Sequence, residues 1–210
     1  MSNPFNPEAG EVPAPTDPRD QALVEQSAKI IWRAFPYFAW RYGARGRSFG
    51  RSDAGYLMTL QSLDEAVARQ QVTWLAGVLA PRGMPSVLLE YQLESLGRLQ
   101  RRSGAPGENR FIALASELRA ARLSALSTAV FAECERSCWA AARGLTQRRG
   151  AGFLIAAAVA DRAIGLGEHD EALVRWLSEA EPVELPWSSA CASARELAMS
   201  RCRDTRSAGP

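Results

Sequence analysis

Apolar residues recur at three- and four-residue steps over most of this chain, the spacing that places them on one face of an α-helix. From residue 19 this pattern runs to Pro36, which must end or kink the first helix because proline lacks the amide donor. The stretch "SLDE" at 62–65 is expected to open a helix that carries, on one apolar stripe, Val67, Gln71, Trp74, Leu75, Val78 and Leu79. Further helices are expected after residue 86, over 110–143, and at about 152–165, 169–181 and 188–202.

The sequence offers no candidate β-strand. No segment of four to eight residues combines strict apolar and polar alternation with enrichment in β-branched residues. We therefore predict an all-α fold, a bundle of about seven helices that includes a C-terminal α-hairpin and contains no sheet.

Composition divides the chain into four parts. Residues 1–18 hold five prolines and few apolar residues, which predicts a flexible leader. The stretch "SGAPGEN" at 103–109 is the best internal boundary, so we expect an N-terminal helical subdomain over 19–102 and a C-terminal one over 110–203. Residues 204–210 are expected to form a disordered tail.

The hairpin expected at 152–182 resembles a single tetratricopeptide-type helix pair. The resemblance rests on Gly167 at the turn, "DEA" at 170–172 opening the second helix, Trp176, and Pro182 closing it. It covers about 30 residues of the chain, and no second copy appears at the 34-residue period of that repeat. The resemblance implies a surface that holds another protein, with Trp176 as a candidate contact residue.

Composition indicates a packed protein without a strong net charge. The chain of 210 residues is 47% hydrophobic and holds six tryptophans, enough apolar surface for a core. Its 25 basic and 23 acidic residues leave a net charge of +2, so it lacks the basic excess of a dedicated nucleic-acid-binding protein. No apolar run reaches the roughly 18 to 20 residues that span a bilayer, and the first residues lack the pattern of a signal peptide. We expect a cytoplasmic protein that does not bind membranes.

Few residues are available for catalysis. His169 is the single histidine, and its position between Glu168 and Asp170 is typical of a solvated helix start rather than of a catalytic base. Neither a phosphate-binding GxxxxGK[ST] motif nor an ExxH motif occurs. We therefore expect a protein that is not an enzyme and needs no cofactor. A cofactor-dependent enzyme without a visible motif is kept as an alternative.

The four cysteines form the one candidate metal site. Cys134 and Cys138 are four residues apart and share a helix face, while Cys191 and Cys202 lie on the last expected helix. Four thiolates on facing helices can bind zinc or an iron–sulfur cluster. Their spacing differs from the tight CxxC pairs of structural zinc sites, so we favour buried thiols and keep the metal site as the alternative.

The segment "RYGARGRSFGRSD" at 41–53 is expected to be a glycine-containing loop between two helices. It holds four candidates for contact with an anion or a partner: Arg41, Arg45, Arg47 and Arg51. Guanidinium groups suit this role because their planar donors match carboxylate and phosphate. The favoured interpretation is a linker whose arginines pair with carboxylates or lie on aromatic rings, and contact with a small anion or nucleic acid is the alternative.

Just before that segment, five aromatic residues lie within nine positions: Trp32, Phe35, Tyr37, Phe38 and Trp40. They either anchor the core or line a groove for a partner helix or an apolar ligand. In the second case the groove residues would be Tyr37, Phe38 and Trp40.

Taken together, these patterns favour a non-enzymatic helical protein-interaction module, either a regulator or a subunit of a larger assembly. Its expected partner is another protein or a second copy of the chain, with nucleic acid as a less favoured alternative. A second hypothesis is a helical sensor that binds a small apolar or anionic ligand through the aromatic cluster and the arginine segment.

Overall fold

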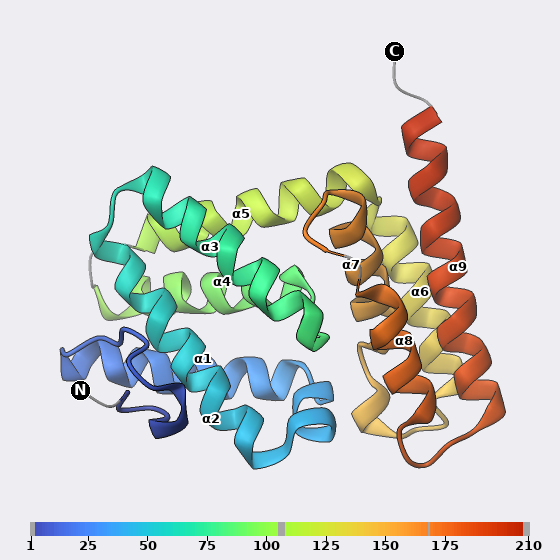
Figure 1. Ribbon diagram of the computed structural model, residues 1–210, viewed down its shortest axis with the longest axis horizontal. Helices are drawn as coiled ribbons and strands as arrows, with labels where there is room; N and C mark the ends of the chain where they lie inside the picture. The colour runs from blue at the N-terminus through green and yellow to red at the C-terminus, as the bar shows by residue number, and fades with distance from the viewer. Residues whose placement is uncertain (1–2, 105–107, 168, 208–210) are drawn as a thin grey trace. The chain divides into compact units, whose positions relative to one another are not determined.

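The described part of the chain, residues 3–104, 108–167 and 169–207, is helical and contains no strand in the computed structural model (Figure 1). The predicted all-α fold is therefore confirmed. Nine α-helices lie in these residues: α1 (Pro18–Ala34), α2 (Tyr37–Thr59), α3 (Glu65–Leu79), α4 (Ser86–Ser103), α5 (Glu108–Ala125), α6 (Thr128–Ala141), α7 (Ala151–Ala163), α8 (Asp170–Glu179) and α9 (Leu185–Ser207). They are accompanied by four short 3-10 helices, η1 (Pro7–Ala9), η2 (Leu60–Ser62), η3 (Ala80–Arg82) and η4 (Thr146–Arg148).

The helices are grouped into two compact units. The first unit comprises Met1–Trp74 and Leu88–Glu117, and the second comprises Leu75–Val87 and Leu118–Pro210. Helices α3, α4 and α5 each contribute residues to both units. The predicted boundary at 103–109 includes residues 105–107, which lie outside the described range, so the two predicted subdomains stay a prediction.

The first unit has a core of aliphatic and aromatic side chains from α1, α2, η2, α4 and α5. The N-cap residue Asp17 starts α1 by accepting a hydrogen bond from the Arg19 amide at 2.8 Å, and Pro18 fits the first helical turn. The buried side chains of this core include Val24, Ile31, Leu57, Met58, Leu60, Leu93, Leu96 and Phe111.

The second unit is built around α7, whose alanine-rich sequence is buried over most of its length. Helices α6, α8 and α9 pack against it, because small side chains allow helices to approach closely. At Gly152 the approach is so close that a Cβ atom would lie 2.2 Å from the backbone oxygen of Cys134 on α6. Trp187 of α9 is fully buried and donates its Nε1–H to the Leu177 carbonyl at 2.8 Å.

The prediction of a loop at 41–53 is wrong. Pro36 does separate two helices, since α1 ends at Ala34, but the arginine segment then lies inside α2. Only Gly43 leaves the helical conformation, with φ 56° and ψ −150°, so α2 is kinked there and continues. A helical glycine costs only about 1 kcal/mol relative to alanine, and the packing of the buried residues near 52–58 offsets that cost.

The prediction of one continuous helical stretch over 110–143 is also wrong, because the structure divides this range into α5 and α6. Ser127 has extended backbone angles, φ −71° and ψ 155°, and is the N-cap of α6. Its carbonyl accepts a hydrogen bond from the Val130 amide at 3.1 Å, which begins the new helix. Serine is a preferred N-cap residue, so the signal for this break was present in the sequence.

Both ends of the chain contain helical residues within the ranges predicted as a flexible leader and a disordered tail. Residues 3–17, within the predicted flexible leader, contain η1 and the buried side chains of Asn3, Phe5 and Asn6. Helix α9 continues through Ser207 into the range predicted as a disordered tail. Residues 208–210 lie outside the described range.

Candidate functional site

Three of the four candidate arginines lie on aromatic rings within the first unit, and the guanidinium carbon of Arg45 is 5.2 Å from the ring centroid of Phe49. The guanidinium carbon of Arg41 is 5.7 Å from the ring centroid of Tyr37 and 5.2 Å from that of Tyr42. The same carbon of Arg47 is 4.8 Å from the ring centroid of Trp32. A guanidinium within about 6 Å of a ring centroid is attracted by the negative charge of the ring face.

Arg45 and Arg51 pair with carboxylates. Arg45 Nε is 2.8 Å from Glu8 Oε2, and Arg51 Nη1 is 3.3 Å from Glu25 Oε1. All four arginines therefore make the intramolecular contacts of the favoured interpretation, although on a helix rather than in a loop. Contact of these arginines with an external anion or nucleic acid stays a prediction.

Three of the aromatic residues around Pro36, namely Trp32, Tyr37 and Phe38, pack on one another, and Phe35 packs on Tyr91. Tyr37 is buried, Phe38 and Trp40 are half-buried, and the ring of Trp32 stacks on Phe38 with 6.1 Å between centroids. Burial raises the pKa of Tyr37 well above its ordinary value, and the neighbouring Tyr42 hydroxyl is the second cause of this increase.

The structure brings Tyr37 and Phe38 together, with 6.2 Å between their ring centroids. Trp176 is half-buried on α8 and belongs to the second unit. The groove formed by these candidates stays a prediction.

All four cysteines are buried, reduced thiols in the second unit. Cys134 Sγ donates to the Ala194 carbonyl at 3.4 Å, and Cys138 Sγ donates to the Ala190 carbonyl at 3.7 Å, so both join α6 to α9. Cys202 makes a similar contact with the Ala125 carbonyl at 3.7 Å. Within the described ranges, no group of three or more histidine, cysteine or acidic side chains is arranged to hold a metal ion.

The two thiols of α6 have raised pKa values, which keep them protonated in the folded protein. Burial, followed by the negative charge of Glu133, raises the pKa of Cys134 to about 11. A hydrogen bond with Cys191, together with burial, holds the pKa of Cys138 far above its ordinary value. Neither thiol is therefore activated as a nucleophile, because the thiolate is the reactive form.

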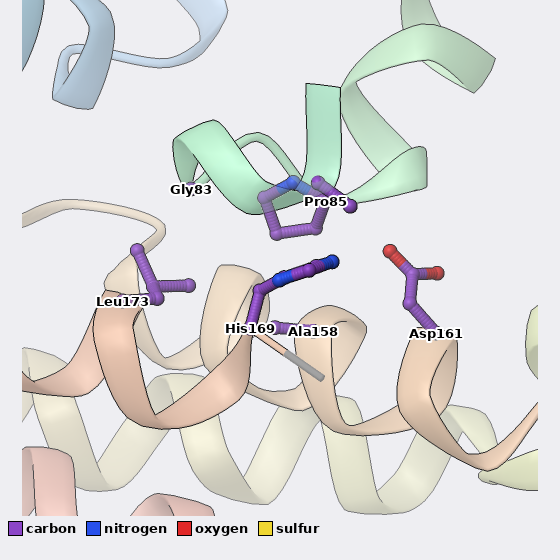
Figure 2. Close-up of a pocket in the computed structure, with 7 residues that line it drawn as sticks. Gly83, Pro85, Ala158, Asp161, His169 and Leu173 are labelled. Carbon is purple, nitrogen blue, oxygen red and sulfur yellow. The ribbon is translucent and has the colours of Figure 1, made fainter. Parts of the chain in front are cut away.

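The single histidine lines a small pocket with a buried aspartate (Figure 2). In Figure 2 the His169 ring lies between Pro85 and Ala158, and the Asp161 carboxylate lies to one side. Asp161 is 1% exposed and accepts hydrogen bonds from the Ser86 amide at 2.6 Å and the Ser86 hydroxyl at 2.5 Å. The carboxylate thus caps the first residue of α4, at the helix end where negative charge is stabilised.

This arrangement does not expose a nucleophile. Ser86 is itself buried, its hydroxyl is bonded to Asp161, and the pocket leaves no room for a water molecule. One signal in the sequence could have pointed to this pair, a lone carboxylate inside the apolar run "AAAVADRA" at 156–163. Its partner Ser86 is 75 residues away in the chain, so only the fold could identify it.

The more open feature is a depression on the surface of α3 in the first unit. It has a volume of about 580 Å³ and is lined by Ala66, Arg69, Gln70, Thr73 and Trp74. The side chain of Trp74 is 56% exposed, and its ring meets the Tyr56 ring nearly edge-on, with 6.1 Å between centroids. The exposed residue Val67 lies on the same helix.

Paired charges fix the side chain of Arg69 at this depression. Its guanidinium makes two hydrogen bonds to Glu117, at 2.6 and 2.8 Å, and one to Glu65 at 2.7 Å. The hydrogen bond from Arg69 lowers the pKa of Glu117, which keeps that carboxylate ionised. Two carboxylates against one guanidinium leave this trio with one net negative charge.

The predicted stripe on α3 was wrong for Val67 and Trp74, which are exposed. The buried positions of this helix include Ala68, Val72 and Leu75, which recur at helical spacing. Trp74 is two residues beyond Val72 and therefore lies about 200° around the helix from it. The spacing of Ala68, Val72 and Leu75 could have separated the two faces of α3.

Comparison of the chain with protein-family models, curated proteins and solved structures gives no match. None of the helices in the described residues is long and apolar enough to cross a membrane. A function is therefore inferred from the chain's own surface and side chains.

Proposed function

We propose that this chain is a non-enzymatic helical protein that binds another protein through α3. The observation that carries the proposal is the indole of Trp74, which is 56% exposed beside an open depression of about 580 Å³. Tryptophan is enriched among the residues that dominate binding energy at protein interfaces, because it buries a large apolar area at low entropic cost.

The surroundings of Trp74 support an interface with a defined geometry. The edge-on contact with Tyr56 restricts the indole, and the hydrogen bond from the Tyr56 hydroxyl to Gln71 holds Tyr56 against α3. A side chain that is already ordered loses less conformational entropy on binding. The net negative trio of Arg69 with Glu65 and Glu117 favours a partner that places a basic side chain beside an apolar one.

The proposed partner is another protein or a second copy of the chain. The proposed location of this binding is the cytoplasm. The pocket around Asp161 does not support the enzymatic alternative, since Ser86 and Asp161 bond to each other and are both buried. The aromatic cluster does not favour the sensor alternative, because the rings of Trp32, Tyr37 and Phe38 pack on one another, and Arg41 and Arg47 cover two of them.

The test is site-specific photo-crosslinking with p-benzoylphenylalanine at position 74, in an extract of the cells that make the protein. Position 139 is the matched control, because Trp139 is 43% exposed on α6 in the second unit. We expect a discrete adduct from position 74 and none from position 139. Excess wild-type chain should compete the adduct away, and excess Trp74→Ala chain should not.

Equal adducts from both positions, or equal competition by wild-type and Trp74→Ala chains, would contradict the proposal. Light scattering of the purified chain distinguishes the two partner types. A dimer that Trp74→Ala converts to a monomer would identify the partner as a second copy.

A further inference from the structure

Residues 3–15 lie against α2 in the first unit, where the darkest blue segment of Figure 1 passes α1 and α2. The contact is made by Phe5, which is 7% exposed and rests directly on Gly55. A Cβ atom at Gly55 would lie 2.8 Å from both Cδ2 and Cε2 of the Phe5 ring, and 3.8 Å from Cδ of Pro15. Glycine is therefore required at position 55 for this contact, because alanine would occupy the space of the ring.

A second contact lies three residues after Phe5. Glu8 Oε2 is 2.8 Å from Nε of Arg45, which projects from the same helix as Gly55. A compact turn sets the spacing of the two anchors, since the side chain of Asn3 accepts hydrogen bonds from the amides of Phe5 at 2.9 Å and Asn6 at 3.1 Å. Asn6 in turn accepts from the Glu8 amide at 3.1 Å.

Residues 3–15 are bound only weakly to the rest of the first unit, although Phe5 is buried. The backbone–backbone hydrogen bonds described for residues 3–15 join the segment to itself, as between the Asn3 amide and the Gly10 carbonyl at 3.2 Å. The Pro15 carbonyl accepts one further hydrogen bond from the Gln21 side chain of α1 at 3.0 Å. The side chains of Glu8 and Arg45 are 59% and 73% exposed, so water and salt screen their attraction. Nδ2 of Asn6 is buried without a hydrogen-bond partner, which disfavours the docked state.

We propose that Gly55 and Arg45 form a recognition slot on α2 for a peptide segment that presents a phenylalanine and, three residues later, a carboxylate. In this structure the chain's own Phe5 and Glu8 fill the slot, and residues 3–15 are a detachable competitor of a partner segment with the same pattern. The occupant defines the chemistry of the slot, an aromatic ring over a glycine and an acidic group on an exposed arginine. The proposal is independent of the surface at Trp74.

The test uses a fluorescent peptide with the sequence of residues 1–17 and measures its anisotropy with full-length chains. The double variant Phe5→Ala/Glu8→Ala has an empty slot, so it should bind the peptide at least about tenfold more tightly than the wild-type chain, whose slot is occupied in cis. Adding Gly55→Ala to the double variant should abolish binding. Adding Arg45→Ala should weaken binding and reduce its dependence on salt.

Gly50 supplies the matched control, since it lies on α2 and a Cβ atom there would meet nothing within 4 Å. Gly50→Ala in the double variant should leave peptide binding unchanged, and a peptide carrying Phe5→Ala should not bind. Circular dichroism and melting establish that each variant is folded, with Glu8→Ala alone as the milder chain if the double variant is not. The proposal is overturned if a folded Phe5→Ala/Glu8→Ala or Glu8→Ala chain gains no peptide binding, or if Gly50→Ala and Gly55→Ala have equal effects.

Discussion

Trp187 and Trp74 have the same side chain and opposite environments. Trp187 is fully buried, donates to the Leu177 carbonyl at 2.8 Å, and supports the Arg148 guanidinium 4.6 Å above its ring. Trp74 is 56% exposed and contacts Tyr56 at one edge. A tryptophan therefore stabilises this fold at position 187 and is available for binding at position 74.

The first prediction follows from this difference. Trp187→Ala should lower the free energy of unfolding by about 3 to 5 kcal/mol, because it leaves a cavity and removes the aromatic ring beneath the buried Arg148 guanidinium. Trp74→Ala should lower it by about 1 kcal/mol or less, the scale of one edge-on aromatic contact. Chemical denaturation of both variants measures the difference, and similar losses would show that Trp74 contributes to the core.

The second prediction concerns the thiol of Cys134. Burial raises its pKa from the ordinary 9.0 to about 11, so the folded state holds the proton more tightly than the unfolded state does. The resulting stabilisation is complete below about pH 9 and is lost as the pH rises from about 9 to about 11. The free energy of unfolding should therefore fall over that range.

Cys134→Ser provides the control for this effect, because a serine hydroxyl can donate to the Ala194 carbonyl and does not titrate in that range. The variant should show a shallower fall with pH. Some slope should remain, since the pKa values of Cys138 and Tyr37 are also raised. Identical profiles for the wild type and Cys134→Ser would show that this thiol does not contribute.

At the scale of elements, the close approach of α6 and α7 depends on one residue. A Cβ atom at Gly152 would lie 2.2 Å from the backbone oxygen of Cys134, and neither helix backbone can move aside cheaply. The burial of alanines along α7 depends on the same short separation, because larger side chains would not fit between the helices.

The third prediction is that Gly152→Ala lowers the free energy of unfolding by about 1 to 3 kcal/mol or more, as expected for an overpacked contact. Gly77→Ala on α3 is the control, because a Cβ atom there would meet nothing within 4 Å. That change should be neutral or stabilise the protein by up to about 1 kcal/mol through helix propensity. Melting temperatures that fall equally in both variants would be inconsistent with backbone contact at Gly152.

The elements also show where sequence patterns were sufficient. The helical period located α1, and the chemistry of Pro36 fixed its end near Ala34. The same reasoning placed a loop at 41–53, where three glycines and several polar residues gave a turn-like composition. The segment is helical because burial near its end, at Ser52 and Gly55, stabilises it beyond its local preference.

On the scale of the whole molecule, the two units and the leading segment differ in how their backbones are protected. Helix α7 is hydrogen-bonded and buried within the second unit. Residues 3–15 rest on the first unit through the Phe5 ring, one exposed ion pair and one hydrogen bond from the Gln21 side chain to the Pro15 carbonyl. Resistance to local opening should therefore be greatest at α7 and least at residues 3–15.

Hydrogen exchange followed by mass spectrometry tests this fourth prediction. Peptides from α7 should exchange slowest among the described helices, and peptides within residues 3–15 should exchange fastest, by several orders of magnitude. Phe5→Ala should accelerate exchange in residues 3–15 and leave α7 unchanged. Protection of residues 3–15 equal to that of α7 would mean that the segment is an integral part of the fold.

The sequence by itself determined that this protein is helical, because helix period, proline stops and the lack of alternating strands depend on residues close together in the chain. It also identified the four arginines of α2 as residues available for contact, but it placed Trp74 on a buried stripe. Only the tertiary structure decided which face each residue occupies. Asp161 caps Ser86, Phe5 rests on Gly55, and Trp74 faces solvent because packing brings together or separates residues that no local pattern relates.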